Sequence, residues 1–273
     1  MGVQKLFSLE GKVIVVTGAT GVLGTSFVNA IAEAGGTVII TGKNEELCIS
    51  RANEVVAGGG KAMGLYCNVL DEEIVVEAKE KILKTFGKID GLVNAAGGNV
   101  PEAVVEEGAD IFNMNIEGMK KALVLNLWGT IIPSQVFGAA MAKNGKGSIV
   151  NISSVSPKNA LTKVLGYSMG KAAIDIYTKW FAVEVANRYG DKIRVNAITP
   201  GFFLTKQNKS LLTNEDGSYK ERANKIIQHT PFKKFGEPDD LKGALIYLLS
   251  DASSFVTGTE ICVDGGFTKF SGV

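Results

Sequence analysis

Residues 12–24, KVIVVTGATGVLG, place a glycine-rich turn between a run of β-branched residues and an apolar helical pattern. Gly18, Gly21 and Gly24 let the backbone turn tightly, approach a pyrophosphate and pack a helix closely on the strand. The N-terminus of that helix also attracts an anion. The spacing is G-x-x-G-x-x-G, which differs from the fingerprint G-x-G-x-x-G, and glycines at such turns are also common structural punctuation. The stretch predicts a strand, a phosphate-binding turn and a helix.

Strand and helix patterns alternate along the rest of the chain. Continuous apolar runs, as expected of strands covered on both faces, are KVIVVT (12–17), TVIIT (37–41), AMGLYCNV (62–69), DGLVNAA (90–96), GSIVNIS (147–153), IRVNAIT (193–199) and EICVDGG (260–266). Helical patterns that end in glycine lie between them, over residues 24–35, 72–87 and 171–190. This alternation implies right-handed crossovers and a mainly parallel, doubly wound α/β sheet.

Length and charge narrow the class of protein. A chain of 273 residues is long enough for one large domain with a buried core. No proline-, serine- or glycine-rich linker divides it, so we expect a single domain over residues 1–273. With 29 Lys+Arg against 28 Asp+Glu, the charges nearly cancel and provide no field that would attract nucleic acid or an acidic membrane. A small, locally recognised ligand fits that balance better.

The cysteines and the histidine do not form a metal-binding pattern. Cys48, Cys67 and Cys262 lie far apart without a C-x-x-C spacing, and the single histidine cannot complete a zinc site with them. Their apolar neighbours indicate that the cysteines are reduced core residues. The histidine, His229, lies in a polar segment and is interpreted as a surface or lid residue.

The longest apolar run covers residues 122–142. The run is interrupted at what would be bilayer depth by Asn126, Pro133, Ser134 and Gln135. A helix buried on several sides, or one at a subunit contact, explains the run more simply. The N-terminus, MGVQKLFSLEGK, lacks the apolar segment of a secretory signal, and Leu6 stands where a myristoylation site has Ser or Thr. We therefore expect a cytoplasmic protein without a membrane partner.

Residues 201–236 depart from the alternation. The segment, GFFLTKQNKSLLTNEDGSYKERANKIIQHTPFKKFG, is polar and irregular and shows no strand pattern. A connection of this length in a compact domain is usually a lid or a binding element. We expect it to be a substrate lid.

Seven short motifs are spaced along nearly the whole chain: TGATGVLG (17–24), NAAG (94–97), Asn126, NISS (151–154), YSMGK (167–171), PGFFLT (200–205) and VDGG (263–266). In this order and spacing they resemble the short-chain dehydrogenases/reductases. The resemblance implies a single Rossmann-type domain with a seven-stranded parallel sheet flanked by helices, usually assembled as a homotetramer. It also implies an NAD(P)-dependent oxidoreductase that acts on CH–OH groups.

The resemblance further implies a proton-handling set of four residues. Tyr167 would be the general acid/base, and Lys171 would activate it and hold the nicotinamide ribose. Ser154 would bind the substrate carbonyl, and Asn126 would hold a proton-relay water. The family's interval of thirteen residues before the tyrosine selects Ser154 over Ser153.

Physical chemistry supports the pairing of Tyr167 with Lys171. The reference pKa of tyrosine is about 10, too high for a base near neutrality. A cation one helical turn away favours the phenolate, and oxidised nicotinamide adds a second positive charge when bound. A hydroxyl from Ser154 can donate a hydrogen bond to the oxygen on which charge develops during hydride transfer.

Each of these residues also has a structural interpretation. A tyrosine and a lysine four positions apart are often a solvated stripe, the serines could cap a turn, and Asn126 could satisfy backbone inside a helix. Their joint occurrence behind a glycine-rich turn favours the catalytic interpretation. A serine hydrolase would need a G-x-S-x-G elbow, which is missing, and its base would have to be His229.

The motifs also predict the cofactor-binding residues. These are Gly18, Thr20, Gly21, Val22, Leu23, Gly24, Lys43, Asn68, Val69, Asn94, Ala95, Ala96, Gly97, Tyr167, Lys171, Pro200, Gly201, Phe203 and Thr205. Asn68 stands where the family commonly has an aspartate that contacts adenine. Thr205 matches the position that holds the nicotinamide carboxamide.

The choice between NAD and NADP should be made after the second strand. An acid there would bind the ribose 2′-hydroxyl, whereas a basic residue would accept a 2′-phosphate. Thr41 and Gly42 are followed by Lys43, so the pattern favours NADP, although Glu45 and Glu46 follow closely.

Two stretches indicate the substrate class. NAAGGN continues into Asn99 and a longer insertion to about Lys121, and PGFFLTKQNKSLLTNEDGS begins the lid. With the SGV terminus, they look like the short-chain type D-mannonate oxidoreductases, also called fructuronate reductases, of bacterial hexuronate catabolism; gluconate 5-dehydrogenases are similar. Amides and cations suit a sugar acid, whose hydroxyls and carboxylate need partners. The candidate residues are Asn99, Lys206, Gln207, Asn208 and Lys209.

The expected reaction is the reversible reduction of fructuronate to mannonate or of a related sugar acid. Alternatives are a gluconate 5-dehydrogenase-like enzyme, a reductase of 3-oxoacyl thioesters, and a nucleotide-sensing regulator that has kept the fold. The complete catalytic set disfavours a regulator. Val100, where related sequences often have a polar residue, leaves the exact substrate open.

Overall fold

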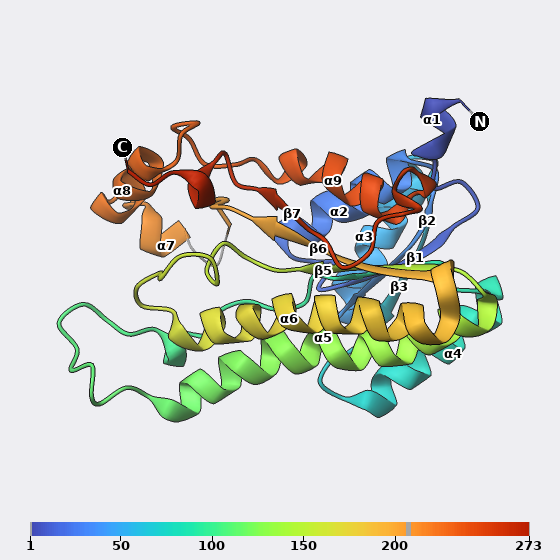
Figure 1. The fold of residues 1–273 in the computed structure, drawn as a ribbon, viewed down its shortest axis with the longest axis horizontal. Coiled ribbons are helices and arrows are strands. Elements are labelled where there is room, and N and C mark those ends of the chain that lie inside the picture. The colour runs from blue at the N-terminus through green and yellow to red at the C-terminus, as the bar shows by residue number, and fades with distance from the viewer. Residues whose placement is uncertain (1, 206–208, 273) are drawn as a thin grey trace.

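The computed structural model describes residues 2–205 and 209–272, and its centre is a single parallel sheet (Figure 1). Seven strands pair in the order β3-β2-β1-β4-β5-β6-β7. They are β1 (Val13–Thr17), β2 (Thr37–Gly42), β3 (Lys61–Tyr66), β4 (Gly91–Asn94), β5 (Gly147–Ile152), β6 (Ile193–Pro200) and β7 (Glu260–Val263), and every pairing is parallel. The predicted doubly wound fold is confirmed.

Helices cover both faces of the sheet. The longer ones are α2 (Val22–Glu33), α3 (Glu45–Ala57), α4 (Glu72–Phe86), α5 (Ile116–Asn144), α6 (Leu165–Tyr189) and α9 (Lys242–Leu249), and α1 (Val3–Leu6) is a short N-terminal turn. One buried apolar cluster contains side chains of α2, α3 and α9, and a second contains side chains of α4, α5 and α6. Figure 1 accordingly shows α2 and α9 on one side of the sheet and α5 and α6 on the other.

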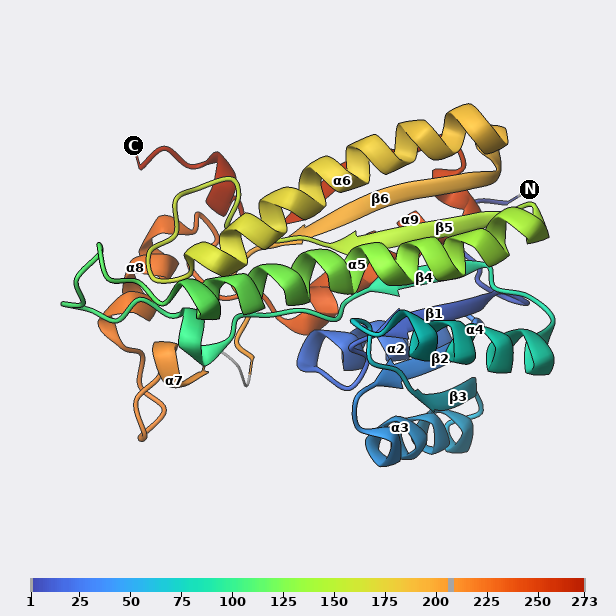
Figure 2. The ribbon, with the colours of Figure 1, turned by 90° about the horizontal axis from the view of Figure 1, so that it is seen from below.

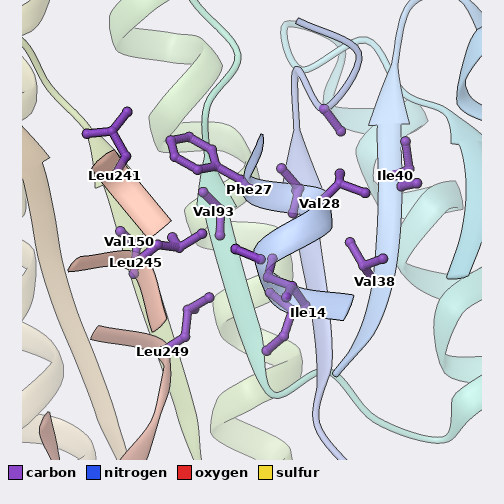
Figure 3. Packing of buried hydrophobic residues seen from close by; sticks show 14 of the residues in the cluster. Ile14, Phe27, Val28, Val38, Ile40, Val93, Val150, Leu241, Leu245 and Leu249 are labelled. Carbon is purple, nitrogen blue, oxygen red and sulfur yellow. The ribbon is translucent and has the colours of Figure 1, made fainter. Parts of the chain in front are cut away.

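Strand β1 shows why the apolar runs lack alternation. Ile14 and Val16 belong to the first cluster, whereas Val13 and Val15 belong to the second. Figure 3 shows Ile14 in the first cluster together with Phe27 of α2. Successive side chains of a strand point to opposite faces, so a strand between two helical layers needs apolar residues at every position. Each buried side chain of this size contributes about 1.5–3 kcal/mol to folding.

Among the described residues, α5 is the one helix that is long and apolar enough to span a membrane by length and composition. Half of its most apolar window is buried, and it lies beside α6 on the sheet (Figure 2). Core helices of globular proteins meet the same criterion. Inside α5, Asn126, Thr130 and Ser134 are buried and hydrogen-bonded, which agrees with the expected burial.

The segment 201–236 is more regular than expected. It contains α7 (Lys209–Leu212) and α8 (Glu221–His229). Ala223 and Ile226 of α8 pack against Phe235, and these contacts form a small third apolar cluster. The expectation of an irregular segment was therefore wrong here, because α8 has few apolar residues and its helical pattern is short.

One cysteine prediction is also wrong. Cys48 and Cys67 are buried, and burial raises the pKa of the Cys48 thiol to about 11 and that of the Cys67 thiol to about 12. Cys262 is exposed, because β7 is the edge strand of the sheet and its neighbours cover it incompletely.

Gly64 of β3 allows α3 to lie directly on the sheet. A Cβ atom at this position would lie 2.4 Å from the backbone carbonyl of Cys48. We expect Gly64→Ala to lower the free energy of unfolding, measured in urea, by about 1–3 kcal/mol. The control is Gly243→Ala in α9, where the added Cβ meets nothing within 4 Å and stability should stay the same or rise slightly. Equal effects of the two substitutions would contradict this packing argument.

Candidate active site

The close approach of α6 to α5 builds the predicted site. A Cβ atom at Gly166 would lie 2.8 Å from the backbone of Met119, and one at Gly170 would lie 2.9 Å from Cβ of Asn126. Figure 2 shows the two helices side by side along the sheet. The absence of a side chain at Gly170 permits this close packing.

Three of the four predicted catalytic residues meet at the end of β5. The hydroxyl of Tyr167 is hydrogen-bonded with Ser154, whose Oγ also accepts the N–H of Ser156 at 3.1 Å. Nζ of Lys171 donates to the carbonyl of Ile152 at 2.7 Å and lies 5.6 Å from the centre of the Tyr167 ring. Lys171 is buried and Tyr167 is partly buried, so the solvated-stripe alternative does not describe the pair.

Burial opposes the charged forms of both residues. It raises the pKa of Tyr167, while the hydrogen bond with Ser154 acts in the opposite direction. It lowers the pKa of Lys171 to about 8, and the negative charge of Asp175 opposes that change. The sequence predicted that Lys171 would favour the phenolate; in the protein alone, the loss of hydration dominates and the neutral phenol is favoured.

Asn126 is fully engaged with backbone. Its Nδ2 donates to the carbonyls of Gly98 and Ala122 at 2.8 and 2.7 Å, and its Oδ1 accepts the N–H of Gly98 at 3.0 Å. The side chain thus satisfies backbone groups, as the alternative interpretation of Asn126 predicted, and it connects the loop after β4 to α5. The proton-relay role of this residue stays a prediction. A Cβ at Gly97 would lie 2.7 Å from Oδ1 of Asn126 and 3.5 Å from Nζ of Lys171, so these residues converge.

The glycine-rich turn after β1 fits a dinucleotide phosphate. Gly18 has a φ of +61°, and its Cβ would lie 2.7 Å from Cα of Ala96, so the turn approaches the loop after β4 closely. A Cβ at Gly24 would lie 2.4 Å from the carbonyl of Gly18. Helix α2 begins at Val22 without a side-chain cap, which leaves its first amide groups for an anion. The backbone therefore provides the cradle that the sequence predicted.

The other predicted cofactor residues follow the carboxyl ends of neighbouring strands. Oγ1 of Thr17 accepts the N–H groups of Ala95 and Ala96 at 3.2 and 3.1 Å and so fixes the NAAG loop beside the turn. Val69 and Phe203 are buried, and Gly201 packs closely against Asp264. In open α/β sheets, ligands bind outside these strand ends.

The end of β2 carries no carboxylate. Gly42 closes the strand, its Cβ position lies 3.4 Å from Oγ1 of Thr20, and Lys43 beside it is exposed. Oδ1 of Asn68 accepts the N–H of Leu70 at 3.3 Å. This arrangement is compatible with either nicotinamide dinucleotide.

Substrate candidates fall into three groups. Lys206, Gln207 and Asn208 lie outside the described residues, and Lys209 begins α7 and is exposed. Asn99 is more informative, because its Oδ1 is buried and accepts no hydrogen bond from the residues that the structure describes.

Arg222 of α8 was not predicted. Its Nη1 donates to Oγ1 of Thr162 at 2.9 Å and its Nη2 to the carbonyl of Thr162 at 3.4 Å, and it contacts no carboxylate in the described part of the chain. The neighbouring Lys163 has a φ of +75°, and its carbonyl accepts the N–H of Val105. The insertion after β4, the loop before α6 and the lid therefore meet at one end of the molecule (Figure 1). In the sequence, Arg222 is one of several cations in the lid and has no distinguishing neighbour.

Comparisons with known proteins extend over nearly the whole chain. A family model described as enoyl-(acyl carrier protein) reductase matches residues 18–268. The uncharacterized oxidoreductase UxuB of Bacillus subtilis is 42% identical over 275 residues, which cover 97% of this chain and 98% of the relative.

Two solved structures are similar as well. A Haemophilus influenzae protein, provisionally named a D-mannonate oxidoreductase and containing bound NAD, has a TM-score of 0.91 and 38% identity and covers 100% of both chains. A gluconate 5-dehydrogenase of Burkholderia cenocepacia, in complex with NADP and tartrate, has a TM-score of 0.86 and 30% identity and covers 98% of this chain and 99% of its own.

Replacement of the Tyr167 hydroxyl tests the proton-transfer role. We expect Tyr167→Phe to lower kcat by at least about 100-fold, because the variant keeps the ring and loses the acid. Nicotinamide absorbance would follow turnover of a keto acid, and fluorescence titration should show unchanged cofactor affinity. Tyr189→Phe, at the exposed end of the same helix, is the matched control. Near-normal turnover of Tyr167→Phe would refute the role.

Proposed function

The chain belongs to the short-chain dehydrogenase/reductase family and is an NAD(P)-dependent oxidoreductase, and within that class we propose that it interconverts fructuronate and mannonate or acts on a closely related sugar acid. In the direction of reduction, a nicotinamide held by the glycine-rich turn and Lys171 would supply the hydride that the keto carbon takes up. Tyr167 gives its proton to the carbonyl oxygen, and the products are the alcohol and the oxidised nicotinamide.

Two polar side chains, Asn99 in the loop after β4 and Arg222 of α8, support the proposal for the substrate. Oδ1 of Asn99 is a buried acceptor without a protein donor among the described residues, as a substrate hydroxyl requires. The guanidinium of Arg222 rests on the uncharged oxygens of Thr162 and can also bind a carboxylate through charge-assisted hydrogen bonds. A steroid or acyl chain would be better served by apolar groups at these positions.

The similar structures support the same class of substrate. The Haemophilus influenzae protein is named for D-mannonate, and the Burkholderia cenocepacia enzyme for gluconate. The latter also contains tartrate, a hydroxy acid. A 3-oxoacyl thioester is the second candidate, because a 3-oxoacyl-[acyl-carrier-protein] reductase of Aquifex aeolicus is 35% identical over 259 residues.

Ser154 and Lys171 are proposed to assist Tyr167. The hydroxyl of Ser154 has one proton, which can turn from Tyr167 to the substrate oxygen as charge develops there. Lys171 lies against the Tyr167 ring and can hold the nicotinamide ribose. Oxidised nicotinamide, when bound, supplies the hydride acceptor and a positive charge that favours the phenolate.

A panel of ketones assayed with both NADH and NADPH tests the proposal. Fructuronate and 5-keto-gluconate represent the sugar acids, and acetoacetyl thioester represents the acyl substrates. We expect turnover of a sugar acid with kcat/KM at least about tenfold above that of the thioester, a difference of about 1.4 kcal/mol in transition-state binding. Preference for the thioester would overturn the substrate assignment, and no turnover at all would favour a nucleotide-sensing role.

Arg222 provides a sharper test of carboxylate recognition. Arg222→Met keeps much of the side-chain bulk and removes the cation, so we expect KM for the sugar acid to rise about 10- to 100-fold while cofactor affinity is unchanged. Lys225→Met is the control, because Lys225 lies on the same helix and pairs with Glu221. Equal, small effects of both substitutions would show that Arg222 does not bind the acid.

The outer faces of α5 and α6 suit the homotetramer that the family resemblance implies. Trp128 of α5 is 48% exposed, and Ile176 and Trp180 of α6 are 64% and 58% exposed. A hollow between the later turns of these helices, away from Tyr167, continues this apolar surface. We propose that a second copy of the chain covers it, and light scattering of the purified protein measures the assembly directly.

A further inference from the structure

Helix α6 carries a chemical stripe that extends beyond the predicted pair. Tyr167, Lys171, Asp175 and Lys179 recur at four-residue spacing, so they lie on one face of the helix. The first two contact the end of β5 through Ser154 and the carbonyl of Ile152. The third, Asp175, contacts Ser153, which lies between Ile152 and Ser154.

Asp175 is a buried carboxylate with two partners, and it is 6% exposed. Its Oδ1 accepts a short hydrogen bond from the hydroxyl of Ser153. Its Oδ2 binds Nζ of Lys158 at 2.8 Å. A buried carboxylate held by two partners keeps its position.

Ser153 is the connection to the catalytic residues. It lies between Ile152, whose carbonyl holds Lys171, and Ser154, whose hydroxyl binds Tyr167. A displacement of this short stretch of backbone would change both contacts together. Such positions are sensitive, because a misplacement of about 1 Å can cost about 100-fold in rate.

We propose that Asp175 is a positioning residue: it fixes the backbone at 152–154 through Ser153, and its negative charge stabilises the ammonium form of Lys171. The proposal concerns the proton chemistry of the site and is independent of which ketone the enzyme reduces. Any ketone that the wild-type enzyme turns over can therefore serve in the test.

The charges around Lys171 determine the direction in which each substitution should shift its pKa. Burial lowers the pKa of Lys171 to about 8, and Asp175 opposes this change. The groups that face Lys171 from the loop after β4, from α5 and from β5 are uncharged: Gly97, Asn126 and the carbonyl of Ile152. Tyr167 lies beside it on α6.

A second layer of charge surrounds Asp175. Lys158 binds both Asp175 and Glu260 of β7, and Glu260 also binds Lys179 at 3.0 Å. Lys158 therefore offsets part of the negative charge that Asp175 exerts on Lys171. Removal of Asp175 and removal of Lys158 should move the protonation of Lys171 in opposite directions.

The experiment is the pH profile of kcat/KM for ketone reduction. Because Tyr167 acts there as an acid and Lys171 is required as the ammonium, the wild-type rate should fall as the pH rises through about 8. Asp175→Asn should move this alkaline limb to lower pH by about one pH unit and lower kcat. Lys158→Met should move the limb to higher pH.

Two further variants separate charge from position. Ser153→Ala keeps the Asp175 carboxylate but removes its hydrogen bond to the backbone segment 152–154. We therefore expect kcat to fall about tenfold while the alkaline limb of the pH profile stays at the same pH. Lys12→Met, which breaks an ion pair with Asp251 at the start of β1, should change neither quantity.

Thermal melting identifies variants that fail to fold. If Asp175→Asn folds and its pH profile matches that of the wild type, the proposal is wrong. If Asp175→Asn does not fold, the two remaining variants decide: an unmoved limb in Lys158→Met together with normal kcat in Ser153→Ala overturns the proposal, and the expected changes support it.

Discussion

The active site depends on the close contact between α5 and α6. Gly166 and Gly170 have no side chain to hold the helices apart, so the backbone of α6 lies against Met119 and Asn126. This contact places Tyr167 and Lys171 within reach of the last residues of β5. A methyl group at either glycine would separate the helices, and the hydrogen bonds of the site would lengthen because they join groups on different elements.

Burial creates the chemical problem that the surrounding charges address. A dry site strengthens every electrostatic interaction within it, but it also disfavours an ionised tyrosine and an ionised lysine. The raised pKa of Tyr167 and the lowered pKa of Lys171 express this cost. Asp175 partly restores the ammonium, and the positive nicotinamide favours the phenolate when it is bound. The polypeptide thus favours the ammonium through Asp175, and a bound oxidised nicotinamide would favour the phenolate.

Much of the fold could be predicted from the sequence because the physical requirements are local. Strands such as β1 are buried on both faces, so they are apolar at every position in the sequence. Gly87 ends α4 in the left-handed conformation, which glycine adopts easily. Contacts between distant segments were harder to predict. Neither Arg222 nor Asp175 has a distinctive neighbour in sequence, and Cys262 is exposed only because β7 is an edge.

The contact between Arg222 and Thr162 affects how the enzyme responds to ionic strength. Thr162 offers a hydroxyl and a carbonyl, so the bond between lid and loop joins a charge to neutral dipoles. Dissolved salt screens attraction between exposed ions far more than it weakens such a short hydrogen bond. If the substrate is an acid, as proposed, rising ionic strength would slow its capture while the contact between Arg222 and Thr162 persists, so the enzyme would lose affinity and keep its architecture.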